Sequence, residues 1–355
     1  DIPAELKVHR VFALDTKRHL SLLGRYPGFL AKPDRWCSWI YTGTRAGHKI
    51  VRQFQPHVIW STYPIASAHA IALRLRHEYK IPWVADFRDL MTEDDWPPDA
   101  RQRRELRGLE KEVITQATRC VFTTPGAASY YKEYYAAEPA AKFVCLPNGF
   151  DESSFTHVKT KEQQVGKRLT LLHAGILYPW ERDPVPFYNA LAALKSKGRV
   201  SASNLSVCLR ATGHDEYHRP LLKKLGIDDI VELAGPLPYR EVLQEMTDSD
   251  GLLIFQADNC NRQIPAKLYE YFRAGRPIFA LTDKHGDTAA QINQEQAGII
   301  CQIDNTNDIE HRLEEFLQTL RNHKAKTIST DRIQRYSRIN QTADLAGVLE
   351  ASMQE

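Results

Sequence analysis

A lysine and a glutamate stand three residues apart in the stretch IPAKLYEYFRAGRPIFAL, residues 264–281. Pro265 suits the first turn of a helix and Gly275 suits its end, so we predict one short helix here. Lys267 and Glu270 would then share one face near the start of this helix. The pair is either an exposed ion pair worth under about 0.5 kcal/mol or part of a phosphate site, because a helix N-terminus attracts anions.

A second cation follows a predicted strand of the same half. The stretch LLHAGILYPWERDP, residues 171–184, places Gly175 at the end of a buried strand and Arg182 further along the loop. A glycine lets a ligand approach the backbone closely. Arg182 either belongs to an anion site or pairs with a neighbouring acid, Glu181 or Asp183.

In the first half, charged residues end a buried strand. The segment IPWVADFRD, residues 81–89, ends in Asp86, Arg88 and Asp89. Ligands of open α/β sheets bind at the carboxyl ends of strands, where either carboxylate could act as a general base. Alternatively, Arg88 pairs with both aspartates as scaffolding. The preceding strand supplies three further candidates for this edge, Ser61, Thr62 and Pro64.

Two acidic clusters resemble metal ligands. Carboxylates of a D-x-D motif can hold a divalent cation, but the DSD at 248–250 precedes a predicted strand and should lie at its amino end. The EDD at 93–95 is expected to be a solvated loop. We therefore expect no metal site.

The composition is that of a globular protein of two domains. The chain has 355 residues, 43% hydrophobic and 26% charged, which is too long for one ordinary core. Residues 1–150 hold 22 Lys and Arg against 16 Asp and Glu, and the remainder holds 25 against 28. This mild asymmetry indicates an anionic partner for the first half, but it lacks the basic stripe of a nucleic-acid-binding protein.

No run approaches eighteen apolar residues, and no signal peptide opens the chain. The six cysteines are scattered singly, which fits a reducing compartment and gives no zinc pattern. We therefore expect a cytoplasmic protein.

Short apolar runs alternate with helical patterns along the chain, as in parallel α/β sheets. Helical patterns lie, for example, at 66–79 and 104–117. The runs predicted as strands are residues 56–62, 81–89, 119–125, 142–149, 169–175, 205–213, 230–235, 251–256, 277–281 and 297–303.

The polar, aperiodic stretch 148–168 separates two halves. We predict two doubly wound domains, residues 1–152 and 165–332, with the amphipathic helices of 333–355 as candidates to pack back on the first. Residues 1–14 read as the end of a loop and a mid-domain strand, and the first half has few strands. We therefore expect an opening βα unit that this chain lacks.

Six segments resemble, in order and spacing, glycosyltransferases of the GT-B fold. PAKLYEYFRAGRPI is similar to the P-x-K-x-x-E-Y motif of family 4 enzymes, a retaining type that uses nucleotide sugars to build bacterial polysaccharides and lipopolysaccharides. The other five are WSTYPIASAHAIALRLRHEYKIPWVADFRDLM with a D-x-R-D signature, VFTTPGAASYY, LPNGFDESSF, LLHAGILYPWERDP and IVELAGPLPYREVLQEMTDSDGLLIF. The resemblance runs from roughly residue 50 onward.

The resemblance implies that the second domain binds a UDP- or GDP-linked sugar without metal or other cofactor. Lys267 and Arg182 would neutralise the leaving diphosphate, and Glu270 would accept the two ribose hydroxyls. The remaining donor-binding positions that it implies are Gly175, Arg210, Pro265 and Leu268.

The first domain would present an acceptor hydroxyl, on a glycan or a polyprenyl-diphosphate-linked molecule, across a cleft. Asp86 or Asp89 would assist the acceptor or the reacting sugar, beside Arg88. Retaining members are mostly thought to react on one face of the sugar with the leaving phosphate taking the acceptor proton, so a dedicated base need not exist.

Two departures from the family keep alternatives open. Arg262 stands where many relatives have a glutamate that contacts the donor sugar, and Ile176 stands where many have an arginine. The chain could instead be an epimerase of the same fold that needs no acceptor. It could also be a non-catalytic partner subunit that binds a nucleotide sugar.

Residues 24–53 interleave Trp, Tyr and Phe with Lys and Arg. This mixture is typical of an anionic membrane interface, although buried aromatics with a solvated basic face would give the same pattern. With a lipid-linked acceptor, we expect peripheral contact at the inner face of the cytoplasmic membrane and no nucleic-acid partner.

Overall fold

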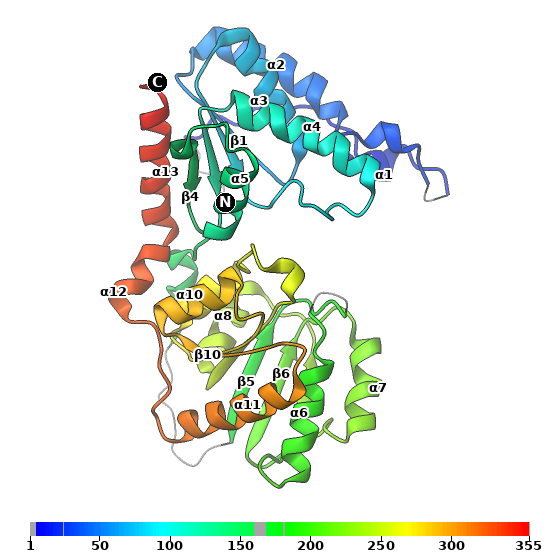
Figure 1. Ribbon diagram of the computed structural model, residues 1–355, viewed down its shortest axis with the longest axis vertical. Helices are drawn as coiled ribbons and strands as arrows, with labels where there is room; N and C mark the ends of the chain where they lie inside the picture. Colours follow the sequence, from blue (N-terminus) through cyan, green and yellow to red (C-terminus); the bar gives the residue numbers. More distant parts are fainter. Residues whose placement is uncertain (1–4, 24, 160–167, 180–181, 355) are drawn as a thin grey trace. The chain divides into compact units, whose positions relative to one another are not determined.

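The computed structural model describes residues 5–23, 25–159, 168–179 and 182–354. The chain divides into two compact units, one of residues 1–146 with 343–355 and one of residues 147–342 (Figure 1). Each unit contains its own parallel sheet. No described helix is both long and apolar enough to cross a bilayer.

The first unit is built on a four-stranded parallel sheet in the order β1-β2-β3-β4. Its strands are β1 (Ile59–Thr62), β2 (Trp83–Phe87), β3 (Arg119–Phe122) and β4 (Phe143–Cys145). Its helices are α1 (Thr16–His19), η1 (Gly28–Ala31), α2 (Ser38–Phe54), α3 (Ala66–Tyr79), α4 (Ala100–Gln116), α5 (Pro125–Tyr134) and η2 (Ala140–Lys142). Every residue of β2 is buried, as the continuous apolar run predicts.

Local capping fixes where these helices begin. The Asp99 side chain accepts a hydrogen bond from the Gln102 backbone N–H at the start of α4. Thr124 caps α5 in the same way, with Pro125 in its first turn. Thr124 follows the end of β3 by two residues, so α5 packs directly back onto the sheet, whereas a longer loop separates β2 from Asp99.

The strand predicted within residues 1–14 is wrong for the part that the structure describes. Residues 7–15 have no regular structure, and the backbone is held by side chains of α2, such as Thr42, which donates to Phe12 O at 2.6 Å. Phe12 itself is 68% exposed. An alternating apolar pattern needs a neighbouring strand to become a sheet, and no described strand pairs with this segment.

The second unit is built on a six-stranded parallel sheet in the order β10-β9-β8-β5-β6-β7. Its strands are β5 (Leu169–Ala174), β6 (Leu205–Arg210), β7 (Val231–Ala234), β8 (Gly251–Phe255), β9 (Ile278–Leu281) and β10 (Gly298–Cys301). Its helices are η3 (Glu152–Phe155), α6 (Val185–Ser196), α7 (Asp215–Leu225), α8 (Tyr239–Asp248), η4 (Asp258–Cys260), α9 (Lys267–Ala274), α10 (Asp287–Glu295), α11 (Thr306–Arg321), α12 (Thr330–Ile333) and η5 (Gln334–Tyr336). The last helix, α13 (Arg338–Ser352), begins in this unit, and its residues from Ala343 onward group with the first.

Both faces of the second sheet are covered. Phe187 of α6 and Phe316 of α11 belong to one buried apolar cluster, and Leu268 of α9 and Ile292 of α10 belong to another. Helices on both faces of a parallel sheet define a doubly wound unit. The predicted α/β class with two Rossmann-like sheets is therefore confirmed, and each of the ten strands in the described residues lies within one of the ten apolar runs between residues 56 and 303.

Candidate functional site

The strand order places a topological switch point at β5. The first strand of the second unit lies between β6 and β8, so the chain turns in opposite directions on its two sides. Ligands of doubly wound sheets bind at this switch point, outside the carboxyl ends of the strands. Helix α9 begins here, and its first residue is Lys267. Pro265 precedes the helix by two residues, so its predicted place in the first turn is corrected.

Two side chains of α9 attach the helix to the end of β5. The Lys267 ammonium donates a hydrogen bond to Ala174 O at 2.7 Å. One turn along, the Tyr271 hydroxyl accepts a hydrogen bond from Ala174 N at 3.1 Å. The start of α9 is therefore fixed at the strand end, with a cation beside it.

A buried histidine of β5 faces this cation. His173 Nδ1 lies 2.9 Å from Leu253 O in the neighbouring strand β8, and its Nε2 lies 3.4 Å from Lys267 Nζ. Burial, with Lys267 as a further cause, holds the pKa of His173 well below its ordinary value. The ring is then neutral, and its Nε2 faces the ammonium.

The same environment favours the neutral form of the Lys267 side chain. Burial, followed by the nearby positive charge of Arg182, lowers the pKa of Lys267 to about 7, while Glu270 acts in the opposite direction. No ion pair joins Lys267 to Glu270 in the described part of the chain. The exposed ion pair that the sequence left open is therefore not what this lysine forms.

Gly175 fits closely against the Lys267 side chain. Its φ of +125° is one that other residues rarely adopt, and an added Cβ would lie 2.6 Å from Lys267 Nζ. The Gly175 N–H donates to Arg210 O of β6 at 2.9 Å. Only glycine allows the strand to end here with the ammonium beside it.

Arg182 lies close enough to Lys267 for its positive charge to lower the pKa of the lysine. Its NH1 is 3.4 Å from Ile176 O, and its guanidinium stacks over the Tyr178 ring at 5.7 Å. Among the described residues, Asp183 forms no ion pair with Arg182 and instead accepts the Val185 N–H. Glu181, the other predicted partner, lies outside the described residues.

Glu270 presents its carboxylate further along α9. Its Oε1 accepts a hydrogen bond from the Tyr239 hydroxyl of α8 at 2.7 Å, and the side chain is half-exposed. A partly solvated carboxylate retains free lone pairs for further donors.

Two residues that were predicted to bind the nucleotide-sugar donor have other partners in the fold. The Arg210 guanidinium donates two hydrogen bonds to the Glu245 carboxylate, at 2.7 and 2.5 Å, and a third to Gly235 O. Leu268 is fully buried in the core, and its N–H donates a hydrogen bond to Pro265 O at 2.9 Å. The structure thus brings together Gly175, Arg182 and Lys267, while it engages Arg210 and Leu268 in the fold.

The first unit gathers acidic groups at the end of β2. Asp86 is buried, and burial raises its pKa against the opposing effect of Arg88, whose NH1 lies 3.6 Å from Oδ1. Burial likewise raises the pKa of Asp89. Thr62, at the end of β1, donates to Asp86 Oδ2 at 3.4 Å. Arg88 thus lies within ion-pair distance of Asp86, and its charge also opposes the effect of burial on the pKa of Asp89.

Ser61 is corrected as an acceptor-binding candidate. It is 8% exposed and points into the core, where its hydroxyl lies 2.7 Å from His69 Nδ1 and accepts the Trp83 indole N–H at 2.8 Å. Side chains alternate along a strand, so Thr62 points to the other face.

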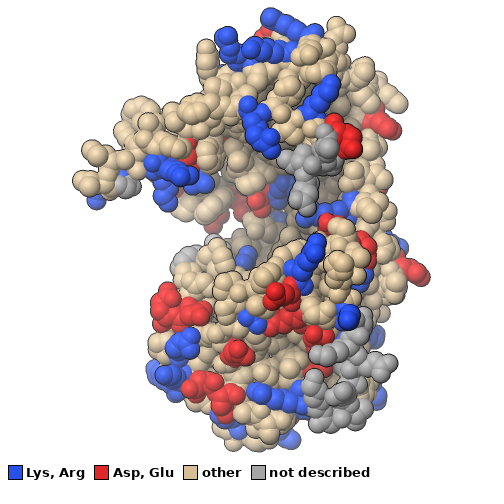
Figure 2. All heavy atoms as spheres, turned by 180° about the vertical axis from the view of Figure 1, so that it is seen from behind, with Lys and Arg blue, Asp and Glu red and all other residues tan. Residues whose placement is uncertain are grey.

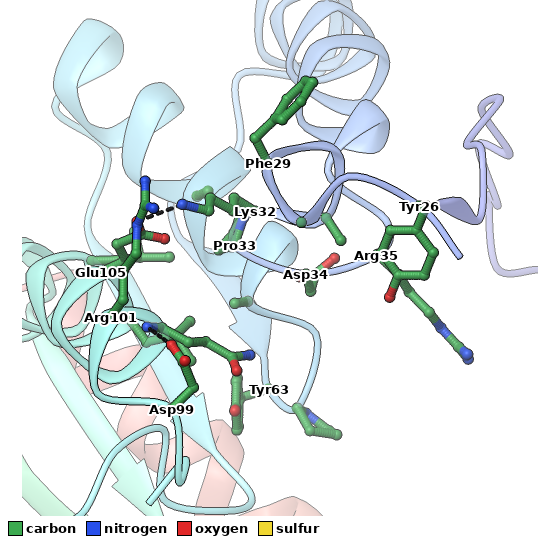
Figure 3. Close-up of a pocket in the computed structure, with 18 residues that line it drawn as sticks. Tyr26, Phe29, Lys32, Pro33, Asp34, Arg35, Tyr63, Asp99, Arg101 and Glu105 are labelled. Atoms are coloured by element: carbon green, nitrogen blue, oxygen red, sulfur yellow. Dashed lines mark hydrogen bonds and ion pairs between the residues drawn. The ribbon is translucent and has the colours of Figure 1, made fainter. Parts of the chain in front are cut away.

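A pocket of about 1070 Å³ lies within the first unit (Figure 3). The segment from Tyr26 to Arg35 forms one wall, and α4 forms the opposite wall. The loop after β1 contributes Tyr63 and Pro64. Lys32 donates to Glu105 of α4 at 2.5 Å, which ties the two walls together. Pro64 therefore lines this pocket, whose lining does not include Asp86, Arg88 or Asp89.

The DSD segment lies at an amino end of the second sheet, as expected. Asp250 Oδ2 accepts hydrogen bonds from the N–H and hydroxyl of Thr170, near the start of β5, at 2.7 and 3.0 Å. This edge of the sheet is opposite the carboxyl end of β5, where Lys267 lies.

Sequence reasoning missed His173 and Tyr271, although both lie inside segments that it singled out. Their positions in the sequence could have indicated them. His173 is two residues before Gly175, and Tyr271 is one helical turn after Lys267.

Comparisons agree with this architecture. Residues 3–149 match the family model of the glycosyl transferase 4-like domain. No curated protein sequence matches the chain. Sucrose-phosphate synthase from Thermosynechococcus elongatus is similar in structure with a TM-score of 0.66 and 11% identity, over 89% of this chain and 78% of the synthase.

Anabaena HepE in complex with UDP and glucose is similar with a TM-score of 0.62 and 14% identity, over 88% of this chain and 81% of HepE. A Listeria monocytogenes protein assigned as a UDP-N-acetylglucosamine 2-epimerase gives a TM-score of 0.56 and 12% identity, over 88% and 78%. The chain therefore has the GT-B fold, and its first unit resembles a glycosyl transferase 4-like domain.

Proposed function

We propose that this chain is a glycosyltransferase. It moves a sugar from a UDP- or GDP-linked donor to a hydroxyl of a glycan or lipid-linked acceptor. The observation that carries the proposal is the Lys267 ammonium at the start of α9, fixed beside Gly175 and near Arg182 at the switch point of the sheet. The glycosyl transferase 4-like match and the fold shared with the UDP complex of HepE support it.

In this proposal the second unit holds the donor by its nucleotide. The diphosphate lies against the N-terminus of α9, between Lys267 and Arg182, where helix N–H groups and two cations attract it. Glu270 accepts the ribose hydroxyls. These cations replace the charge that a metal would supply, so the proposal includes no metal.

The chemistry is the exchange of one bond at the anomeric carbon. The bond from this carbon to the phosphate oxygen breaks, and a bond to the acceptor oxygen forms on the same face, with retention. The acceptor proton passes to the leaving phosphate. Lys267 and Arg182 stabilise the charge that develops on the diphosphate, which is the main catalytic task of such a site.

The first unit holds the acceptor. The aromatic and charged lining of its pocket suits a molecule larger than one sugar, and Asp86, Asp89 and Arg88 at the end of β2 suit contacts to hydroxyls. Such acceptors are assembled at the inner face of the cytoplasmic membrane, so we place the protein in the cytoplasm.

A thermal-shift screen of UDP, GDP, ADP and CMP tests the donor class. A bound nucleotide stabilises the folded state by mass action, and we expect UDP or GDP to raise the Tm. Glu270→Ala and Arg182→Ala should abolish the shift while the free proteins melt normally. Unchanged shifts in both variants would refute the site.

The fold shared with an epimerase makes epimerisation the second candidate. Incubation with UDP-N-acetylglucosamine alone distinguishes the two. An isomerised sugar nucleotide in the absence of acceptor would identify an epimerase, whereas a glycosyltransferase needs an added acceptor to consume the donor.

A further inference from the structure

The segment from Asp15 to Arg35 forms a folded projection of the first unit. Thr16 joins its two ends, because its N–H donates to Arg35 O at 2.9 Å and its hydroxyl donates to Leu30 O at 2.7 Å. Between them, Leu22 and Arg25 form an antiparallel bridge. In Figure 1 this dark blue segment extends beyond the helices of the unit, with α1 at its base.

The projection exposes apolar side chains. Leu23 is 95% exposed, Leu22 80% and Phe29 69%, and Leu20 next to them is 44% exposed. Single exposed leucines are ordinary, but four large apolar side chains on one short projection mark an interaction site.

The same projection carries basic side chains. Lys17, Arg18 and Arg25 are all exposed, and within the described residues no carboxylate lies within ion-pair distance of them. The two acids of the projection are engaged elsewhere. Asp15 is buried and accepts backbone N–H groups at the start of α1, and Asp34 accepts from Ser67 at the start of α3. Figure 2 shows Lys and Arg side chains on the projection in the view from behind.

We propose that this projection binds the surface of an anionic lipid bilayer. Leu20, Leu22 and Leu23 enter the boundary between headgroups and acyl chains, while Lys17, Arg18 and Arg25 contact lipid phosphates. Insertion into a bilayer needs only a few apolar side chains flanked by cations, which is what this segment offers.

This inference goes beyond the proposed function and gives the acceptor pocket a direct connection to the membrane. Phe29 belongs to the exposed apolar group and also lines the pocket. A lipid-linked acceptor could then reach the pocket from the bilayer on which the projection lies.

Co-sedimentation with vesicles tests the proposal. The full chain is mixed with vesicles of equal parts phosphatidylglycerol and phosphatidylcholine, or of phosphatidylcholine alone. We expect binding that is at least tenfold stronger to the anionic vesicles and weaker at high salt, since surface charge interactions are screened. The double variant Leu22→Ser/Leu23→Ser and the triple variant Lys17→Gln/Arg18→Gln/Arg25→Gln should each lose at least tenfold.

Matched controls lie elsewhere on the surface. Ile339→Ser removes another highly exposed apolar side chain, and Lys223→Gln/Lys224→Gln removes exposed cations at the end of α7. Both should bind vesicles like the parent. All variants should keep the parent melting temperature and the nucleotide-induced shift, which separates this result from the test of the donor site. Equal binding to both vesicle types, or wild-type binding by the leucine variant, would overturn the proposal.

Discussion

The carboxyl ends of β5 and β2 carry opposite charges. At β5 the half-buried Lys267 lies near Arg182, with a neutral histidine beneath it. At β2 the buried Asp86 forms an ion pair with Arg88, and the exposed Asp89 lies near the same arginine. The same parallel-sheet geometry thus produces a cationic edge in one unit and an acidic edge in the other.

Burial acts on both edges in the same chemical direction, toward the neutral form. It lowers the pKa of Lys267 to about 7 and raises that of Asp86. A bound diphosphate would restore the charge of the lysine, whereas a sugar hydroxyl can bond to a carboxyl group in either state. The comparison teaches that burial disfavours charge at both edges, and that an anionic ligand would restore the charge only at the β5 edge.

The largest expected effect comes from removing the cation of the β5 edge. Lys267→Ala should weaken UDP binding by up to about 3 kcal/mol, the upper value for a hydrogen bond to a charged group. Calorimetric titration at pH 7 measures it. The matched control is Lys224→Ala, an exposed lysine at the end of α7. Equal affinity in the two variants would contradict the assignment of the β5 edge as the anion site.

The next effect comes from filling the space beside that cation. Gly175→Ala places a methyl group 2.6 Å from Lys267 Nζ at a backbone φ of +125°. We expect the free energy of unfolding to fall by about 2 kcal/mol and UDP affinity to fall with it, as measured by urea denaturation and titration.

Gly108→Ala is the control for that substitution, because Gly108 lies inside α4 with no atom within 4 Å of the added Cβ. It should stabilise the helix by about 0.5–1 kcal/mol. If both substitutions had the same effect, Gly175 would not be specially required.

The pH dependence of UDP binding sharpens the comparison. Because the pKa of free Lys267 is about 7, the protein must take up a proton to bind a diphosphate above that pH. Affinity should then fall by up to about 1.4 kcal/mol per pH unit between pH 7 and 9. Lys267→Arg should bind with a flat profile, since a guanidinium stays charged, and a falling profile in that variant would rule out Lys267 as the titrating group.

The same pKa fixes the sign of a stability effect. The folded value lies below the ordinary 10.5, so the unfolded chain binds more protons between about pH 7 and 10.5. Without ligand, this group therefore makes the free energy of unfolding rise with pH across that window.

The smallest effect is expected at the acidic edge. The pKa of Asp86 is raised above its ordinary 3.8, so its contribution to stability falls as pH rises through the window between the two values. Asp86→Asn should therefore raise the Tm at pH 7, by about 2–4 °C at most, while the exposed Glu133→Gln leaves it unchanged. A lower Tm for Asp86→Asn in differential scanning calorimetry would show that Arg88 outweighs burial.

Much of the fold could be predicted because it depends on short-range patterns. The strand β2 is a continuous apolar run, α3 covers the residues of its helical pattern, and Gly275 ends α9 with a positive φ. The segment at residues 7–15 is the exception, since a strand also requires a partner that its own pattern cannot supply.

The sequence by itself determined which residues stand at strand ends and that Lys267 lies in the first turn of a helix. Only the tertiary structure decided their partners. It bonds Lys267 to Ala174, 93 residues away, rather than to Glu270, and turns Ser61 into the core toward His69. The physical reason is that spacing along a helix or strand fixes the direction of a side chain, whereas the crossing of distant strands and helices fixes what it meets.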